Sequence, residues 1–175
     1  MIEGQRLHLR KIELTDVNEN YRAWMNDPEV MRYTESRFRT HSLEDIRTYV
    51  RSVRSDANSV FCAIIEKETG KHIGNIKIGH ILPVHRTADV GIIIGDRNCW
   101  GRGYATEALK LAASYAADTL KLHKLWAGIY ADNPGSVKAF LRAGFVEEGR
   151  FIRHWFSGSD YVDGLQMGLL LEGRQ

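Results

Sequence analysis

The chain has 175 residues, of which 43% are apolar and 26% charged, with a formal net charge of +2. This length fits one domain with a full core and is short for two. The small net charge argues against nucleic acid as a partner, and no apolar run approaches the ~20 residues that span a bilayer. Cys62 and Cys99 are far apart and the seven histidines do not cluster, so no metal site is expected. We predict a single domain over residues 1–175, located in the cytoplasm and without membrane contact.

The first third of the chain predicts one strand and two helices. Apolar and polar residues alternate in "RLHLRKIEL", which is typical of a strand. Thr15 is the expected N-cap of a first helix, which ends at Asp27-Pro28. A second helix is expected to begin near Ser42, with Asp45 as its capping-box partner.

The remainder predicts a sheet interrupted by two helices. The runs "SVFCAIIE", "HIGNIKIGHI" and "ADVGIIIG" follow one another closely and indicate an antiparallel meander. An alanine-rich helix follows, then the strand "KLWAGIYA" and the helix "PGSVKAFLRAG", which Gly144 ends as a C-cap. A last hairpin turns over residues 157–160. The expected order β-α-α-β-β-β-α-β-α-β-β is a mixed α/β fold.

The stretch "GDRNCWGRGYATEAL" places glycines directly before the alanine-rich helix. No Walker A loop is present, and Thr106 stands where a dinucleotide fingerprint needs its third glycine. A helix N-terminus presents free N–H groups that bind phosphate, and Gly101 and Gly103 let the backbone approach it closely. Arg102 adds a positive charge. A simple helix-capping turn is the alternative interpretation.

The same stretch resembles a known family motif. "WGRGYATEAL" is similar to the acetyl-CoA-binding motif of the GNAT superfamily, in the form typical of RimJ/RimL-type N-acetyltransferases. Trp100 holds the first position, where the general pattern has Gln or Arg. "DNPGSVKAFLRAGF" resembles a second family segment, through Asn133, Ser136, Gly144 and Phe145.

The resemblance implies the GNAT fold, with a mostly antiparallel sheet that is splayed at the acetyl-CoA site and flanked by helices. The pantetheine arm would lie between "ADVGIIIG" and "KLWAGIYA". Asn133 would orient the pantetheine or cap its helix, and Lys138 and Arg142 would reach phosphates or remain solvated. The implied acetyl-CoA contacts are Val90, Gly91, Ile92, Ile93, Gly101, Arg102, Gly103, Tyr104, Ala105, Thr106, Asn133, Ser136, Lys138, Phe140 and Arg142.

Direct attack of an amine on a thioester needs a base for the ammonium proton and a proton source for the leaving thiolate. Many family members carry a tyrosine as the acid where this chain has Phe140. Ser136, Tyr130 or water could supply the proton instead, and Ser136 is preferred. Alternatively, CoA leaves as a thiolate that the end of the helix stabilises. Asp89 is the first candidate for the base, and His80, His85 and His154 are further candidates because histidine titrates near neutrality.

The resemblance leaves the acceptor open between a nucleotide-linked amino sugar and a protein N-terminal amine. We expect "WMNDPEVMRYTESRFRT" to form part of the acceptor wall, with Trp24, Tyr33 and His154 as substrate contacts. Arg37 and Arg39 suit a phosphorylated acceptor better than a polycation. A non-catalytic acyl-CoA-binding or regulatory module is the alternative function, and a homodimer is the oligomer common among relatives.

Overall fold

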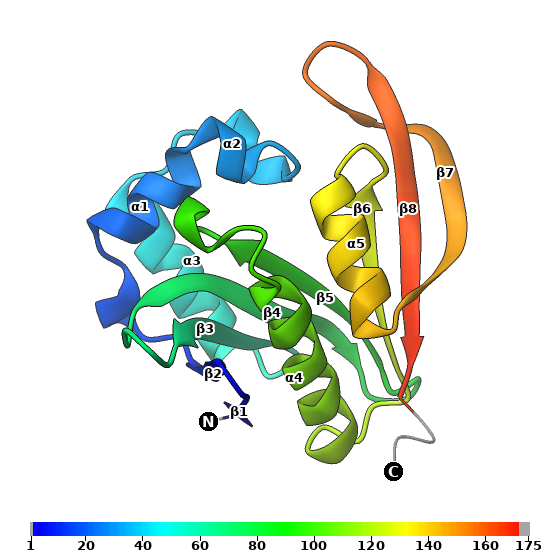
Figure 1. The fold of residues 1–175 in the computed structure, drawn as a ribbon, viewed down its shortest axis with the longest axis horizontal. Helices are drawn as coiled ribbons and strands as arrows, with labels where there is room; N and C mark the ends of the chain where they lie inside the picture. Colours follow the sequence, from blue (N-terminus) through cyan, green and yellow to red (C-terminus); the bar gives the residue numbers. More distant parts are fainter. Residues whose placement is uncertain (1, 172–175) are drawn as a thin grey trace.

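The structure is a computed structural model that describes residues 2–171 (Figure 1). Eight strands form one sheet in the order β1-β2-β3-β4-β5-β6-β8-β7, and every neighbouring pair is antiparallel except β5 and β6. The strands are β1 (Ile2–Glu3), β2 (Leu7–Lys11), β3 (Val60–Glu66), β4 (His72–Leu82), β5 (Thr87–Ile94), β6 (Lys124–Tyr130), β7 (Val146–Phe156) and β8 (Tyr161–Leu170). The predicted GNAT fold is confirmed.

Helices cover both faces of this sheet. The α-helices are α1 (Glu19–Asn26), α2 (Pro28–Met31), α3 (Leu43–Ser55), α4 (Tyr104–Asp118) and α5 (Pro134–Ala143), and the 3₁₀ turns are η1 (Leu14–Asp16), η2 (Glu35–Phe38) and η3 (Arg97–Cys99). α4 and α5 lie on one face, and α3 lies on the other (Figure 1). Within residues 2–171, no helix is long and apolar enough to cross a membrane.

Alternation along β3 shows how the sheet serves two cores. Cys62 and Ile64 are buried in the large cluster that also contains the apolar faces of α4 and α5. Phe61 packs instead against the smaller cluster formed by Ile46 and Val50 of α3. Neighbouring residues of a strand point to opposite faces of the sheet, so β3 contributes side chains to both hydrophobic clusters.

Local chemistry accounts for the elements that were predicted well. The Ser42 side chain accepts a hydrogen bond from the Asp45 N–H, and the Asp45 carboxylate accepts one from the Ser42 N–H, which confirms the capping box of α3. Gly144 ends α5 with φ of 99°. The meander of β3, β4 and β5 and the final hairpin of β7 and β8 are also confirmed.

The start of the first helix was predicted wrongly. Asn18, not Thr15, caps α1, because Leu14–Asp16 form a 3₁₀ turn before it. Asp27 caps a further short helix, α2, with Pro28 at its first position, and β1 adds a two-residue strand at the sheet edge. Both additions are too short to leave a periodic pattern in the sequence.

Asp16 holds the turn before α1 from a buried position. Arg10 donates two hydrogen bonds to its carboxylate, at 2.6 and 2.7 Å, and the Glu13 N–H donates a third at 2.7 Å. Burial alone would raise the pKa of Asp16, but these hydrogen bonds outweigh it and hold the pKa below its ordinary value.

We predict that Asp16→Asn lowers the free energy of unfolding by about 2 kcal/mol at pH 7. This loss is smaller than that for breaking a fully buried ion pair, because the Arg10 side chain is one-third exposed. A carboxyl with a lowered folded-state pKa stabilises the fold above its unfolded pKa of about 3.9 and loses this effect in acid. Denaturant unfolding should therefore show the gap between wild type and variant narrowing below about pH 4. Asp118→Asn, at an exposed site on α4, should change little at any pH; an equal loss there would contradict the assignment.

Candidate active site

The central feature of the site is the divergence of β5 and β6. Their parallel pairing covers only three positions and ends where Asp89 faces Trp126. Beyond this vertex β5 pairs with β4, and β6 pairs with β8. Within the described residues, the β6-facing edge of Val90–Ile93 therefore has no strand partner. This open edge presents backbone groups that an extended ligand could pair with.

The turn before α4 lies at the end of β5. Gly101 and Gly103 have φ of 73° and 80°, the left-handed region that favours glycine. A Cβ at Gly101 would meet no atom within 4 Å, so this position faces open space. Gly103 is the N-cap of α4 and supplies no side-chain cap, which leaves the first N–H groups of a 15-residue helix available to an anion.

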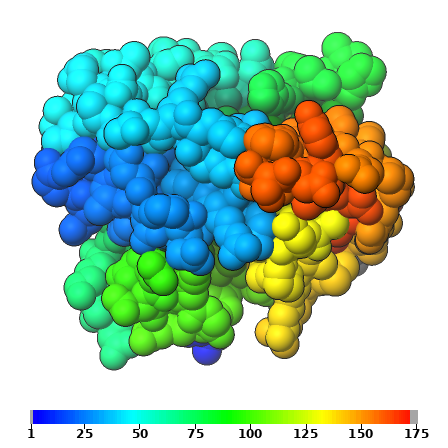
Figure 2. Space-filling view, turned by 90° about the horizontal axis from the view of Figure 1, so that it is seen from above, coloured from blue at the N-terminus to red at the C-terminus, as the bar shows by residue number. Residues whose placement is uncertain are grey.

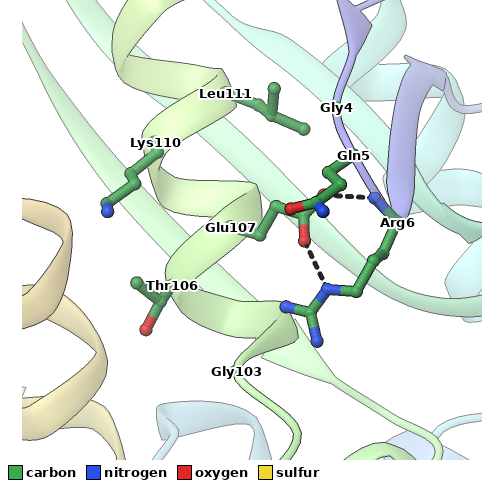
Figure 3. Close-up of a pocket in the computed structure, with 8 residues that line it drawn as sticks. All are labelled: Gly4, Gln5, Arg6, Gly103, Thr106, Glu107, Lys110 and Leu111. Carbon is green, nitrogen blue, oxygen red and sulfur yellow. Dashed lines mark hydrogen bonds and ion pairs between the residues drawn. The ribbon is translucent and has the colours of Figure 1, made fainter.

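Residues far apart in the sequence hold this turn in place. The Arg6 guanidinium donates to the Arg102 carbonyl at 2.7 Å and to Glu107 Oε2 at 2.9 Å. Glu107 Oε1 accepts the Arg6 and Leu7 N–H groups at 2.7 and 3.1 Å. The contact lines an open hollow of about 300 Å³. In Figure 3, the Thr106 and Lys110 side chains point away from Arg6.

A buried carboxylate supports the turn from below. Glu66 Oε1 accepts the Tyr104 hydroxyl at 2.6 Å, and Glu66 Oε2 accepts the Thr69 hydroxyl at 2.6 Å. These hydrogen bonds hold the pKa of Glu66 below its ordinary value, so it is charged at neutral pH. The exposed Arg102 guanidinium lies 3.9 Å from Glu66. Tyr104 is thus a buried support, and its side chain lies between Glu66 and the arginines Arg6 and Arg102.

The start of α5 lies across the gap from this turn. Asn133 caps the helix by accepting the Ser136 N–H at 3.0 Å, which confirms the capping interpretation of that residue. Lys138 and Arg142 are exposed on α5. Phe140 is only 2% exposed and packs edge-on against Phe145, with ring centroids 4.9 Å apart. Phe140 is therefore a core residue, and its ring offers almost no exposed surface for the predicted contact with acetyl-CoA.

Asp89 lies on the other face of the sheet. Its neighbours Ala88 and Val90 are buried in the cluster with α4 and α5, so Asp89 points to the opposite side. Asp89 Oδ2 lies 3.1 Å from His80 Nδ1, while Asp89 Oδ1 is buried and has no hydrogen-bond partner among the described residues. The structure thus separates Asp89 from Ser136, which belongs to the α5 side.

Trp24 occupies the mouth of the site rather than an open wall. Its ring lies directly over Gly95, where a Cβ would come within 2.2 Å of it, and edge-on to His72 at 5.1 Å. Gly95, directly after β5, therefore marks a close approach of another group, which is the Trp24 ring.

An aromatic cluster closes the open end of the gap. Tyr130, at the end of β6, stacks with Trp155 at 5.6 Å and lies 5.9 Å from Tyr33. Its hydroxyl donates to Glu35 Oε1 at 2.9 Å. Burial, followed by this hydrogen bond, raises the pKa of Tyr130 to about 12, so it is a weaker proton donor than an ordinary tyrosine.

Arg37 joins the two sides of the opening. It donates to the carbonyls of Arg32 and Phe156, and it lies over the rings of Tyr130 and Phe38. In Figure 2, which looks down on the opening, the segment around η2 meets the tip of the β7–β8 hairpin, and a notch remains between the chain leading into α4 and the start of α5. His154 is exposed on β7, with its ring 4.7 Å from that of Trp155.

Sequence reasoning missed several of these contacts. Arg6 and Glu66 lie outside both family motifs, and Glu107 lies within the first one but was not singled out; only their contacts with the turn identify them. Glu35 and Trp155 were also missed, although Trp155 lies two residues from a glycine-containing turn that brings the hairpin back. Among the candidate histidines, His80 contacts Asp89, whereas His85 is exposed in the β4–β5 turn.

The comparisons with known proteins agree with this geometry. Residues 6–146 match the family model described as acetyltransferase (GNAT) domain. An uncharacterised N-acetyltransferase, p20 of Bacillus licheniformis, is 31% identical over 154 residues, which cover 83% of this chain and 82% of that protein. Spermidine N(1)-acetyltransferase of Vibrio cholerae is 28% identical over 169 residues, covering 95% and 94%.

Solved structures show the same relationship. The crystal structure of Vibrio cholerae spermidine N-acetyltransferase in complex with CoA and spermine superposes with a TM-score of 0.85 at 26% identity, covering 95% of this chain and 96% of that one. A dodecameric structure of the Vibrio cholerae enzyme has a TM-score of 0.78 at 24% identity, covering 95% and 94%. The chain belongs to the GNAT family of acetyltransferases, and its reaction moves an acetyl group from acetyl-CoA to an amine.

Proposed function

We propose that acetyl-CoA binds along the open edge of β5 and that an amine with a negatively charged remainder approaches from the opposite face of the sheet. The divergence of β5 and β6 after Asp89 is the observation that carries this proposal. The pantetheine would pair with Val90, Gly91, Ile92 and Ile93, as an added strand pairs with a free edge. The pyrophosphate would bind the N–H groups from Gly101 to Thr106, including those of Arg102, Gly103, Tyr104 and Ala105.

The start of α5 would complete the acetyl-CoA site. The Asn133 Oδ1 is used by the Ser136 N–H, so the Asn133 Nδ2 is the group we assign to the pantetheine. Lys138 and Arg142 would reach the phosphates, and both side chains are exposed on the helix surface. Phe140 would support this surface by packing beneath it.

The ammonium nitrogen loses one proton before the attack and a second as the amide forms, and the leaving thiolate takes up one proton. The amine nitrogen attacks the thioester carbon, the C–N bond forms, the C–S bond breaks, and the thiolate leaves. We assign removal of the ammonium proton to Asp89, acting directly or through a group that it holds. We assign the Ser136 hydroxyl, at the N-terminus of α5, to the thiolate, because Phe140 carries no proton to donate.

The acceptor wall favours an anionic acceptor over a polycation. Arg32, Arg37 and Arg39 lie on the segment between α2 and α3, where Glu35 is already used by the Tyr130 hydroxyl. We therefore propose a nucleotide-linked amino sugar, with Tyr33 and His154 as aromatic contacts and Trp24 bounding the pocket. A protein N-terminal amine is the alternative acceptor. It would fit a RimJ/RimL-type enzyme, a type that Trp100 supports. Spermidine is a second candidate, because spermidine N-acetyltransferases resemble the chain over nearly its full length.

The acceptor is tested by thiol release from acetyl-CoA with three classes of amine: nucleotide-linked amino sugars, spermidine and spermine, and short peptides with a free N-terminus. We predict the highest kcat/KM for the amino sugars. Reversing the charge of the wall with Arg39→Glu should lower that value about tenfold, since one lost contact to a charged group is worth about 1.4 kcal/mol. Faster turnover of spermidine, improved further by Arg39→Glu, would refute the anionic acceptor.

The phosphate turn is tested with Gly101→Ala. The added methyl group would enter open space that we assign to the pyrophosphate, and φ of 73° adds strain of about 1 kcal/mol. We predict a KM for acetyl-CoA raised about tenfold or more, with the KM for the amine little changed. Gly158→Ala is the matched control, because Gly158 also has a positive φ and open space but lies in the β7–β8 turn. Equal effects of both variants on acetyl-CoA would contradict the site.

We also propose that the chain self-associates, as a homodimer in the simplest form. Phe151, Ile152 and Phe156 are exposed on β7, an edge strand of the sheet. Sedimentation velocity should show a species larger than 20 kDa, and Ile152→Lys should shift it toward the monomer. A monomer at all concentrations would refute this. A cytoplasmic location remains a prediction that fits the two free cysteines.

A further inference from the structure

A bulge in β4 turns His80 toward the site. Gly79 faces Asp89 across β4 and β5, and the register then shifts before Leu82 pairs with Thr87. In a regular strand, His80 would point to the face opposite that of its neighbour Gly79. At the bulge His80 instead adopts a left-handed backbone, with φ of 45°, and its Nδ1 lies 3.1 Å from Asp89 Oδ2. A left-handed non-glycine residue costs about 1 kcal/mol or more and is common at functional sites.

Asp89 is held in a way that calls for a positive partner. Its Oδ1 is buried without a hydrogen bond in the part of the chain described, over Gly79, where a Cβ would come within 2.7 Å of it. A buried carboxylate oxygen without a donor is costly, and its negative charge favours a cation beside it. Oδ2 has one neighbour that can become such a cation, the His80 imidazole.

The imidazole itself is open to solvent. The His80 side chain is 77% exposed, whereas that of Asp89 is 26% exposed. Lys77 of β4 and Asp56 after α3 are the other charged groups near His80, and Lys77 contacts the Tyr49 hydroxyl of α3 at 3.3 Å. Trp126 pairs with Asp89 from β6 and carries no charge. Two carboxylates and one ammonium thus lie around the ring.

We propose that His80 is the proton acceptor of the reaction and that Asp89 is its positioning residue. This inference rests on the proposed part of Asp89 in deprotonating the amine, and it names the group through which Asp89 acts. The Nδ1–H donates to Asp89 Oδ2, which fixes the tautomer and leaves the Nε2 lone pair free. This contact lies at the vertex where β5 and β6 part, on the face opposite α4 and α5.

The proton balance of this step is simple. The acceptor ammonium gives one proton to His80 Nε2, directly or through one water, and becomes the neutral amine that attacks the thioester. The imidazolium is stabilised by the adjacent carboxylate and later returns its proton to solvent. After the C–N bond has formed, the nitrogen gives its second proton to solvent and becomes the amide nitrogen. The leaving thiolate takes one proton on the α5 side, so deprotonation of the ammonium and protonation of the thiolate occur on opposite faces of the sheet.

Two substitutions of His80 separate chemistry from structure. His80→Gly removes the imidazole and suits the left-handed backbone, and His80→Asn keeps an N–H donor for Asp89 but cannot accept a proton. With the fastest amine of the panel, we expect both variants to lose about 100-fold in kcat at pH 7, with the KM for acetyl-CoA within twofold of wild type. Imidazole added to the buffer should restore activity to His80→Gly and not to His80→Asn. Both deficits should shrink above pH 9, where more of the amine is already neutral.

Matched controls make the outcome decisive. His85→Gly and His85→Asn, in the exposed β4–β5 turn, should keep wild-type activity, and thermal unfolding should confirm that all variants fold. A His80→Asn enzyme within threefold of wild-type kcat at pH 7 would overturn the inference. If Asp89→Asn is then inactive, Asp89 is itself the base and the proposed function stands. If Asp89→Asn is also fully active, the proposed role of Asp89 fails as well.

Discussion

The pairing of β5 with β6 over only three residues is the constraint on which the rest of the site depends. Two strands can part inside a sheet only if each retains another neighbour, since a buried strand edge without partners is costly. β5 keeps β4 along its whole length, and β6 keeps β8 along its whole length. The opening therefore leaves one edge of each strand free while the sheet remains continuous at the vertex.

Packing on one face of the sheet and contacts at the open end of the gap hold the two diverging strands in place. On one face, α4 packs against β5 and its neighbours, while the α5 cluster with Phe140 and Phe145 packs against β6. At the open end, Arg37 and the Tyr130 cluster tie the η2 segment to the β7–β8 hairpin. Contacts on one face and at the open end thus hold the two halves of the sheet together around the gap.

The sequence predicts the parts of this structure that depend on local chemistry. The capping box of Ser42 and Asp45, the C-cap at Gly144 and the glycine turn before α4 each involve residues within a few positions of one another. The Thr15 prediction failed because of a contact with the preceding strand. Arg10 of β2 donates to Asp16, which is part of a 3₁₀ turn, and α1 is therefore capped only at Asn18. Gly95 shows the same limit, since no local pattern indicates that Trp24 packs over it.

The candidate site was predictable as a set of backbone positions and much less so as a set of side-chain contacts. Arg6 and Glu107 are about a hundred positions apart, and no spacing rule connects them. The contact between His80 and Asp89 depends on a bulge that changes which face His80 occupies, and a regular alternation would have placed the two on opposite sides. A register shift of this kind leaves no mark on the hydrophobic pattern.

The alternation of side chains along β5 also divides the work of the site between the two faces. Ala88 and Val90 are committed to the core beneath α4, so the free backbone edge beside them is the only part of β5 that a cofactor on that side can use. Asp89, between them, is forced to the other face, where it meets His80. A thioester lying in the gap would then have helix N-termini on one side and a carboxylate–imidazole pair on the other. Positive dipoles would face the departing thiolate, and the proton acceptor would face the incoming amine, because a strand cannot place consecutive side chains on the same face.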